Sequence, residues 1–297
     1  MSLLSYRMVT RVNATLAHSR LSGESLEHQV VLACVLEVSA SKPGNITPAH
    51  DFSDTTYADM VRSALRLGQV FARRRVLRRS VGELIADGVK ATARAAGANT
   101  NLGIVLLFAP LARAAVTREA HESLRPALER ILARLDVEDA AAAFAAIVRS
   151  GPGGLGDVPE HDVRAPARVT LREAMVAAAH RDSIASEYAT GYAIVFDAGL
   201  PLLVQVLASG RRTLDAIVSL HVGLLAAHPD TLIARKAGDA AARAVTAAAR
   251  QVQDGTLALA DFDASLRADG NRLNPGTTAD LVAATLLAAL LSGVRLP

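Results

Sequence analysis

The sequence is poor in aromatic residues and in cysteine. Only 3% of its 297 residues are aromatic, none is tryptophan and one is cysteine, although 51% are hydrophobic. The core must therefore be built mainly from alanine, leucine and valine. Alanine and leucine favour helices, whereas strands are enriched in β-branched and aromatic residues. The composition therefore predicts an all-α protein.

The sequence also lacks the common motifs of metal and nucleotide sites. The single cysteine, Cys34, excludes an intramolecular disulfide and a cysteine-based zinc site. None of the eight histidines stands in a His-x-His or His-Glu-x-x-His pattern, and the phosphate-loop and Gly-x-Gly-x-x-Gly motifs are absent. The formal net charge of +3 does not indicate a nucleic-acid or membrane partner.

No apolar run is long enough to cross a bilayer. The longest, Leu281 to Val294, is shorter than the roughly 18 to 20 residues that a span needs, so we expect a buried C-terminal helix there. Arg7, Arg11 and Arg20 interrupt the first residues before a signal peptide can form. We therefore expect a cytoplasmic protein.

Helix signals follow one another along the chain without an intervening strand. Capping boxes at Ser80/Glu83, Thr170/Glu173 and Thr277/Asp280 predict helices over 80–96, 171–195 and 277–293. Apolar residues at three- and four-residue steps predict further helices over 24–40, 54–74, 101–117, 123–149, 202–227 and 238–252. The glycine-rich stretch Gly151–Gly156 and the polar segment after it predict an irregular loop, 151–169, within a single all-α domain, 1–297. A loop of this kind often covers or lines a site.

A polar stretch follows the first predicted helix. Glu37 lies in the last turn of an otherwise apolar helix, where burial and the negative end of the helix dipole both disfavour a carboxylate. Lys42 follows in the helix-ending sequence Ser41–Asn45, and Asp51 and Asp54 precede the next helix. Capping explains these residues plainly, with Lys42 on the last carbonyls and Asp54 at the next helix start. The alternative is a functional purpose for Glu37.

Two more polar stretches stand at predicted helix starts. Asn99, Thr100 and Asn101 lie between Gly97 and Gly103, where they are either an N-cap or a phosphate-binding turn. The third comprises Asp230–Lys236 and Asn271–Asp280, in which Asp230 and Arg235 are either an exposed ion pair or part of a site. Three such stretches together indicate a cleft of helix ends that binds a metal and a polyphosphate.

In their order and spacing, these stretches resemble the triphosphoribosyl-dephospho-CoA synthase family from about Glu37 to Leu290. The residues that carry the resemblance are Glu37 with Ser41-Lys42-Pro43-Gly44, His50-Asp51-Phe52, Arg62-Ser63-Ala64, Gly97–Gly103, Glu187 with Gly191-Tyr192, Leu200-Pro201, Asp230-Thr231 with Arg235-Lys236, Pro275-Gly276, and Ala279-Asp280-Leu281. The resemblance implies an all-α transferase that joins ribose C1 of ATP to the 2′-hydroxyl of 3′-dephospho-CoA and releases adenine.

The resemblance also implies roles for the candidate residues. Displacement at an anomeric carbon needs a carboxylate to accept the proton of the attacking hydroxyl and to stabilise positive charge, for which we expect Glu37 and Glu187. The triphosphate of ATP is expected to bind Lys42, Arg235 and Lys236, and Asn99, Thr100 and Asn101 are expected to hold phosphate or ribose. Mg²⁺ is the expected cofactor, with Asp51, Asp230 and Asp280 as ligands.

The sequence departs from the family pattern at three positions. Asn101 and Leu102 replace a His-Lys pair, and Ala185 replaces an arginine, although Arg181 and Asp182 lie one turn earlier. These departures indicate a divergent branch and leave three alternatives open. The first is a related ribosyl or phosphoribosyl-type transferase of another cofactor pathway, such as that of a methanopterin-type one-carbon cofactor. The second is a metal-dependent nucleotide glycohydrolase, and the third is a non-catalytic helical binding protein. The apolar C-terminal helix would also suit a homodimer.

Overall fold

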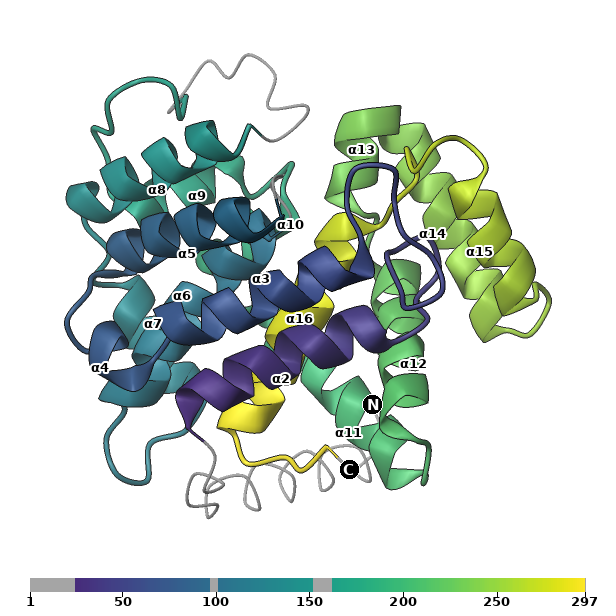
Figure 1. Ribbon diagram of the computed structural model, residues 1–297, viewed down its shortest axis with the longest axis horizontal. Helices are drawn as coiled ribbons and strands as arrows, with labels where there is room; N and C mark the ends of the chain where they lie inside the picture. Colours follow the sequence, from purple (N-terminus) through teal and green to yellow (C-terminus); the bar gives the residue numbers. More distant parts are fainter. Residues whose placement is uncertain (1–24, 97–100, 152–161, 297) are drawn as a thin grey trace.

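The computed structural model describes residues 25–96, 101–151 and 162–296 (Figure 1). These residues form fifteen α-helices and one π-helix, and they contain no β-strand. The prediction of an all-α fold is therefore confirmed. An isolated bridge between Thr47 and His50 closes a turn after the first described helix.

The helices follow one another through short connections. They are α2 (Leu26–Ser39), α3 (Tyr57–Val70), α4 (Arg73–Val76), α5 (Val81–Ala96), α6 (Leu102–Thr117), α7 (Leu124–Leu132), α8 (Val137–Ser150), α9 (Leu171–Ala178), α10 (Ser183–Thr190), the π-helix η1 (Ile194–Gly199), α11 (Leu200–Ala208), α12 (Thr213–Ala227), α13 (Thr231–Ala237), α14 (Asp239–Gln253), α15 (Leu259–Arg267) and α16 (Gly276–Leu291).

Two of the three predicted capping boxes are present. Ser80 and Glu83 exchange side-chain and backbone hydrogen bonds, and Thr170 does so with Glu173. The third is wrong, because α16 already begins at Gly276 and the side chain of Thr277 bonds to another helix instead. At the start of α3, Thr56 is the N-cap rather than the expected Asp54.

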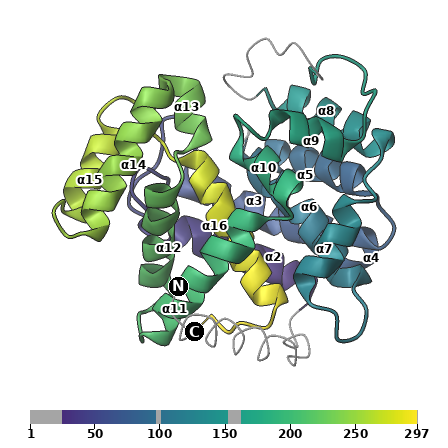
Figure 2. The same cartoon turned by 180° about the vertical axis from the view of Figure 1, so that it is seen from behind.

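Helix α16 lies at the centre of the molecule (Figures 1 and 2). It packs against α2, α6, η1 and α12, and every residue from Leu281 to Leu291 is buried. A helix that is apolar on all sides is expected to be surrounded by protein. The prediction of a buried C-terminal helix is therefore confirmed. Because these side chains are buried, α16 has no exposed apolar face, and the homodimer stays a prediction.

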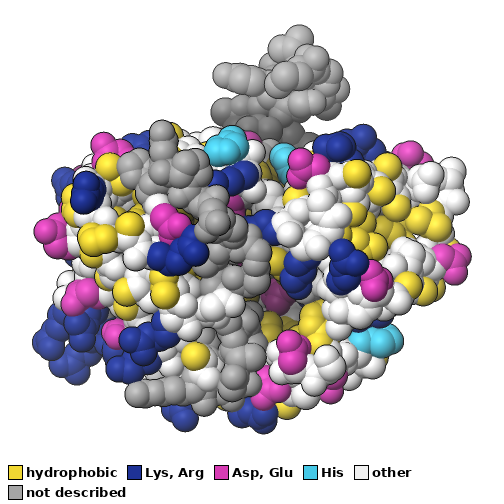
Figure 3. Space-filling model, turned by 90° about the horizontal axis from the view of Figure 1, so that it is seen from above, with side chains coloured by type: hydrophobic (Ala, Val, Ile, Leu, Met, Phe, Trp, Pro, Cys, Tyr) yellow, Lys and Arg dark blue, Asp and Glu magenta, His cyan; other side chains and the backbone are white. Residues whose placement is uncertain are grey.

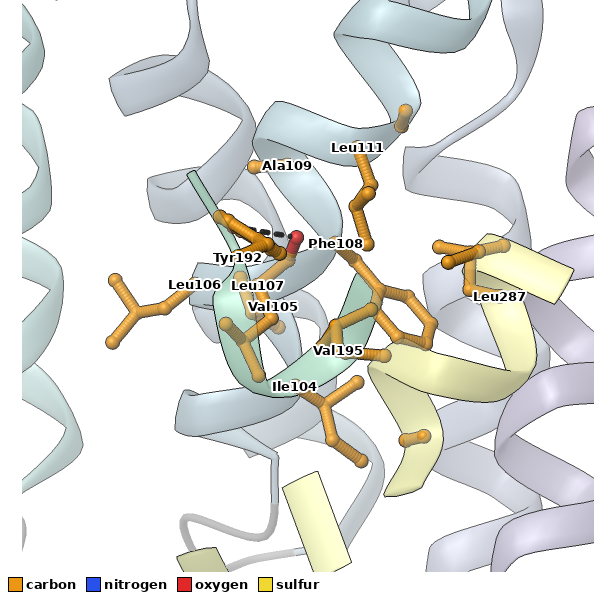
Figure 4. Packing of buried hydrophobic residues seen from close by; sticks show 14 of the residues in the cluster. Ile104, Val105, Leu106, Leu107, Phe108, Ala109, Leu111, Tyr192, Val195 and Leu287 are labelled. Carbon is orange, nitrogen blue, oxygen red and sulfur yellow. Dashed lines mark hydrogen bonds between the residues drawn. The ribbon is translucent and has the colours of Figure 1, made fainter. Parts of the chain in front are cut away.

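Helix α6 is the second mainly buried element of the core. Its side chains from Ile104 to Leu111 pack against Tyr192, Val195 and Leu287 (Figure 4). The hydroxyl of Tyr192 donates to the Leu107 carbonyl at 3.0 Å. This bond satisfies the one polar atom of a fully buried ring.

A second, smaller hydrophobic cluster lies within α12 to α15, with Phe262 and Leu266 among its buried residues. Helices α8, α9 and α10 lie on the opposite side of the first turns of α16 (Figures 1 and 2). The fold therefore places two groups of helices around one end of its central helix. The expectation of a single domain over the whole chain stays a prediction.

In the described ranges, no single helix has both the length and the apolar composition of a membrane span. Two pairs of consecutive helices, each sharply bent at a short break, meet those criteria only when both members are counted together. They are α10 with the segment of η1 and α11, and α12 with α13.

Candidate active site

A cavity of about 870 Å³ lies where the two groups of helices meet at the N-terminal end of α16. Its wall includes the end of α2, the connection from α2 to α3, parts of α8, α9 and α13, and the first residues of α6, α10 and α16. Viewed from above, the surface between the two groups is hollowed, and charged side chains of both signs stand at its edges (Figure 3). The volume falls within the roughly 300 to 1,000 Å³ of ordinary ligand pockets.

Glu37 lies in the wall of this cavity and forms a buried ion pair. Oε1 of Glu37 is 2.9 Å from Nζ of Lys42, and both side chains are at most 5% exposed. The same ammonium donates to the Glu37 carbonyl, so Lys42 also caps the end of α2 as expected. Burial and the positive charge of Lys42 lower the pKa of His221, on α12, to about 3. The ammonium of Lys42 already contacts both the carboxylate and the carbonyl of Glu37, so it is not free to bind a phosphate.

Asp280 also lies in the cavity wall, and its carboxyl group forms no hydrogen bond or ion pair with any residue that the structure describes. It is the fifth residue of α16, not the third as the expected capping box required. Its carboxylate lies against Gly103 in the first turn of α6, where a Cβ atom would come within 2.0 Å of Oδ2. Only glycine leaves room for the carboxylate there.

The surroundings of Asp280 disfavour its charged form. Burial raises the pKa of Asp280 well above its ordinary value, and the nearby negative charges of Glu37, Asp230 and Asp182 raise it further. Arg235 opposes them with a smaller effect. The cavity therefore contains one carboxyl group paired with Lys42 and one that favours its proton. Environments that separate two carboxyl groups in this way are typical of acid and base pairs in catalysis.

Asp230 lies beside the cavity but not in its wall. Its Oδ1 accepts hydrogen bonds from the backbone N–H groups of Leu232 and Ile233, which makes it the N-cap of α13. Its Oδ2 accepts from both the N–H and the hydroxyl of Thr278, each at 2.7 Å. Asp230 therefore joins the first turns of α13 and α16. Its lone pairs are used in this way, so the geometry supports a structural role rather than metal binding.

The cations of the cavity come from α13 and from the connection before α10. Arg235 and Lys236 line the cavity as expected, and so does Arg181. Arg235 pairs with Asp182 across the cavity at 2.5 Å, not with Asp230. The other oxygen of Asp182 caps α10 by accepting from Ile184 and Ala185. Of the two alternatives for Asp230 and Arg235, the exposed ion pair between them is therefore wrong.

The remaining expected site residues are placed differently. Asp51 is exposed and accepts from the backbone N–H of Tyr57 at 2.6 Å, outside the cavity wall. Asn101 is buried as the N-cap residue of α6, and its neighbours Leu102 and Gly103 line the cavity. Asn99 and Thr100 lie outside the described residues.

Glu187 is fully buried outside the cavity wall. Its two oxygens accept from the N–H groups of Ile194 and Val195, at 2.9 and 3.0 Å. Burial raises its pKa to about 7, although these two bonds favour the charged form. Glu187 therefore satisfies the start of the π-helix, and the geometry does not support the catalytic role expected for it.

Three helices of eight residues or more begin at the cavity, namely α6, α10 and α16. The N-terminal end of a helix carries partial positive charge and attracts anions. Together with Arg181, Arg235 and Lys236, these helix starts make one region of the cavity suitable for a polyphosphate.

Sequence analysis missed several residues of the cavity wall. The amide of Asn45 donates to Oδ1 of Asn274 at 2.7 Å, and both residues line the cavity. Asp54 and Thr277 line it as well. Asn45 and Asn274 could have been found from the sequence, because they lie in two of the polar stretches, near Lys42 and beside Pro275. Gly151, Asp162 and Val163, which belong to the described parts of the predicted loop 151–169, line the cavity as well.

The expected magnesium ligands do not gather into one site. Of Asp51, Asp230 and Asp280, only Asp280 faces the cavity, and the described residues contain no group of three histidine, cysteine, aspartate or glutamate side chains placed to hold a metal. The side chains present therefore do not fit a magnesium site built by the protein.

The chain was compared with known families, curated proteins and solved structures. The model of the family described as CitG, ATP:dephospho-CoA triphosphoribosyl transferase, matches residues 23–296. A crystal structure described as a "putative triphosphoribosyl-dephospho-coA synthase from Archaeoglobus fulgidus" superimposes with a TM-score of 0.63. The two chains are 27% identical, and the alignment covers 78% of this chain and 99% of the other. The search of curated proteins returned no match. The family model spans nearly the whole chain, so the protein belongs to the ATP:dephospho-CoA triphosphoribosyl transferase family and is a transferase that uses ATP and dephospho-CoA.

Proposed function

We propose that the transfer takes place in the cavity at the N-terminal end of α16, with Glu37 and Asp280 as its catalytic residues. The observation that carries this proposal is the presence of two carboxyl groups of opposite character in one wall, with cations and helix starts beside them. The reaction forms a bond between ribose C1 of ATP and the 2′-oxygen of dephospho-CoA, and it breaks the bond between C1 and adenine.

Glu37 acts as the base. Lys42 stabilises its negative charge, and a fixed anion next to C1 also stabilises the positive charge that develops on the ribose. Glu37 accepts the proton of the 2′-hydroxyl as the new bond forms.

Asp280 acts as the acid. Its raised pKa keeps a proton on the carboxyl group, and that proton passes to adenine as the bond to C1 breaks. The proton lost by Asp280 and the one gained by Glu37 balance, and exchange with water restores both groups. Asp280 thus has a different role from the metal ligand expected from the sequence.

The triphosphate lies against Arg235, Lys236 and the starts of α6 and α16. Binding it requires Arg235 to share its guanidinium between Asp182 and a phosphate oxygen. We propose that Mg²⁺ enters with the triphosphate, since magnesium is commonly held by substrate phosphates and one or two carboxylates. No step of the reaction is assigned to it.

The proposal is tested with purified protein, ATP, Mg²⁺ and dephospho-CoA, by measuring adenine release and the mass of the acceptor. We expect one adenine per triphosphoribosylated acceptor. Glu37→Gln should lower kcat by about 100-fold or more, whereas Glu37→Asp, which keeps a charge beside Lys42, should retain more activity. The matched control is Glu27→Gln, in the first turn of the same helix and outside the cavity wall.

The outcomes separate the alternatives. Adenine release without a heavier acceptor would show a glycohydrolase. Full activity of Glu37→Gln would refute the base assignment. Thermal protection by ATP without either product would show that the nucleotide site exists but that dephospho-CoA is not the acceptor.

A further inference from the structure

The wall of the cavity changes character from one side to the other. Glu37, Asp280, Arg235 and Lys236 come from α2, α16 and α13. Another part of the wall is lined by apolar side chains of α8 and α9, namely Phe144, Ile147 and Met175. Helices α8 and α9 stand away from α13 in both ribbon views (Figures 1 and 2). The cavity therefore has a charged end at the carboxyl groups and an apolar end at α8 and α9.

The apolar end continues beyond the cavity. A second hollow of about 640 Å³ lies between α8 and residues 163–167, and it shares Phe144 and Val163 with the first. Its lining contains Ala141, Ala145 and Val148 of α8. The described surface thus offers an extended, largely apolar path that starts at the cavity and follows α8.

The covalent structures of ATP and dephospho-CoA indicate which of their chemical groups can reach this apolar path. The adenine of ATP is bonded directly to the reacting C1, so it must stay beside Glu37 and Asp280. The pantetheine arm of dephospho-CoA is separated from the reacting 2′-hydroxyl by the rest of the ribose and a pyrophosphate. The arm is uncharged and carries a gem-dimethyl group and several methylenes, which favour an apolar wall.

We propose that the apolar end and the hollow along α8 bind the pantetheine arm of the acceptor. This inference rests on the proposed function, because it uses the position of the two carboxyl groups to orient dephospho-CoA. Arg181 lies between α9 and α10, at the rim between the two ends, and no described acidic side chain forms an ion pair with it. Its guanidinium is placed to meet the pyrophosphate that links the arm to the ribose.

The test compares dephospho-CoA with ADP, which keeps the adenosine and the pyrophosphate but lacks the arm. Ala178, at the end of α9, lines the cavity, whereas the adjacent Ala179 does not. Ala178→Phe places a large ring in the cavity wall at the end of α9, and Ala179→Phe is the matched control. Val163→Glu, at a partly exposed position shared by both hollows, is a second variant that does not enlarge a buried residue. Binding is measured by calorimetry, and adenine release from ATP is measured with each acceptor.

We expect the wild-type protein to bind dephospho-CoA at least about tenfold more tightly than ADP, the effect of burying about two methylene groups. Ala178→Phe and Val163→Glu should remove this preference without changing the affinity for ADP, and Ala179→Phe should retain it. Equal affinity of the wild-type protein for both acceptors would overturn the inference. So would a loss of affinity for ATP in Ala178→Phe, because the apolar end would then hold the donor adenine.

The binding measurement also separates this inference from the reaction. A preference for dephospho-CoA that depends on Ala178 supports the arm site even if adenine is not released, in which case the proposed reaction fails. Adenine release at equal rates with ADP and dephospho-CoA supports the reaction and overturns the arm site.

Discussion

The carboxyl group of Asp280 is expected to increase activity but to lower the stability of the folded protein when it is ionised. Its carboxyl group is partly buried beside three other acids, so ionisation of Asp280 opposes folding. Because its folded pKa is raised, the stability linked to its proton is complete at low pH and is lost as pH rises through that pKa. Asp280→Asn should therefore lower kcat by about 10²- to 10⁴-fold and raise the unfolding temperature at pH 8.

The measurement combines a pH–rate profile with thermal unfolding at pH 5 and pH 8. The wild-type rate should fall as pH rises through the pKa of the acid, and this limb should be missing from the residual rate of the variant. Asp261→Asn, at an exposed position of α15, serves as the control. A variant that keeps the alkaline limb would remove Asp280 from the role of acid.

At the scale of the residue, Glu37, Glu187 and Asp280 were all predicted site residues, and the structure places Glu37 and Asp280 in the cavity wall and Glu187 outside it. All three are acids in apolar helices, and their surroundings distinguish them. The oxygens of Glu187 meet two backbone N–H groups of a π-helix, and no sequence pattern indicated that π-helix. Lys42 was correctly placed beside Glu37 because both lie in one local turn.

At the scale of the element, Asp230 determines how α13 and α16 begin. Asp230→Asn keeps an oxygen for the N-cap of α13 but places an amide where the N–H and hydroxyl of Thr278 now donate. The hydroxyl of Thr278 can turn and accept from that amide, but its backbone N–H would face a donor, so we expect a loss of roughly 1–3 kcal/mol in the free energy of unfolding.

Urea denaturation measures this loss, with Thr278→Val as a partner variant that removes only the hydroxyl bond. Thr278→Val should cost less than Asp230→Asn, because the backbone N–H keeps its acceptor. Equal costs in the two variants would show that the backbone bond contributes nothing.

The helix boundaries show what local patterns reveal. The predicted helices over 24–40 and 101–117 match α2 and α6 closely. The segment over 123–149 forms two helices, α7 and α8, because Asp136 and Asp139 make a capping box within it. Similar breaks occur at Asp182, which caps α10, and at Gly210, whose φ of +82° ends a helix. Alanine-rich periodicity continues across these breaks, so it concealed them.

At the scale of the whole molecule, the buried carboxyl of Glu187 makes stability depend on pH. Its pKa is about 7 in the folded protein against an ordinary 4.5. The folded state therefore holds a proton between these values that the unfolded chain has released. The stability linked to that proton is complete below pH 4.5 and is lost as pH rises through 7, by on the order of 3 kcal/mol.

This pH dependence is measured by denaturation between pH 4.5 and 8. In Glu187→Gln the free energy of unfolding should change less across that range, whatever the constant cost of the amide. Glu129→Gln, at an exposed position, should follow the wild-type curve. A variant curve parallel to that of the wild type would contradict the raised pKa.

The cavity itself was beyond sequence analysis in its details. Asn45 and Asn274 are in hydrogen-bond contact although they are 229 positions apart, and Asp182 meets Arg235 across 53 positions. Polar stretches at helix ends predicted that a cleft exists. Local patterns do not show that Asp280 faces the cavity whereas Asp230 joins two helices. Both placements depend on packing between distant parts of the chain.

The central position of α16 has a consequence for how the enzyme fails on heating. The helix that carries Asp280 is buried from Leu281 to Leu291. Amide hydrogens in such a helix exchange with solvent through opening of much of the fold rather than through fraying. Asp280, the proposed acid, therefore belongs to the last part of the protein to open, and we expect catalysis to persist up to the temperature at which the whole fold melts.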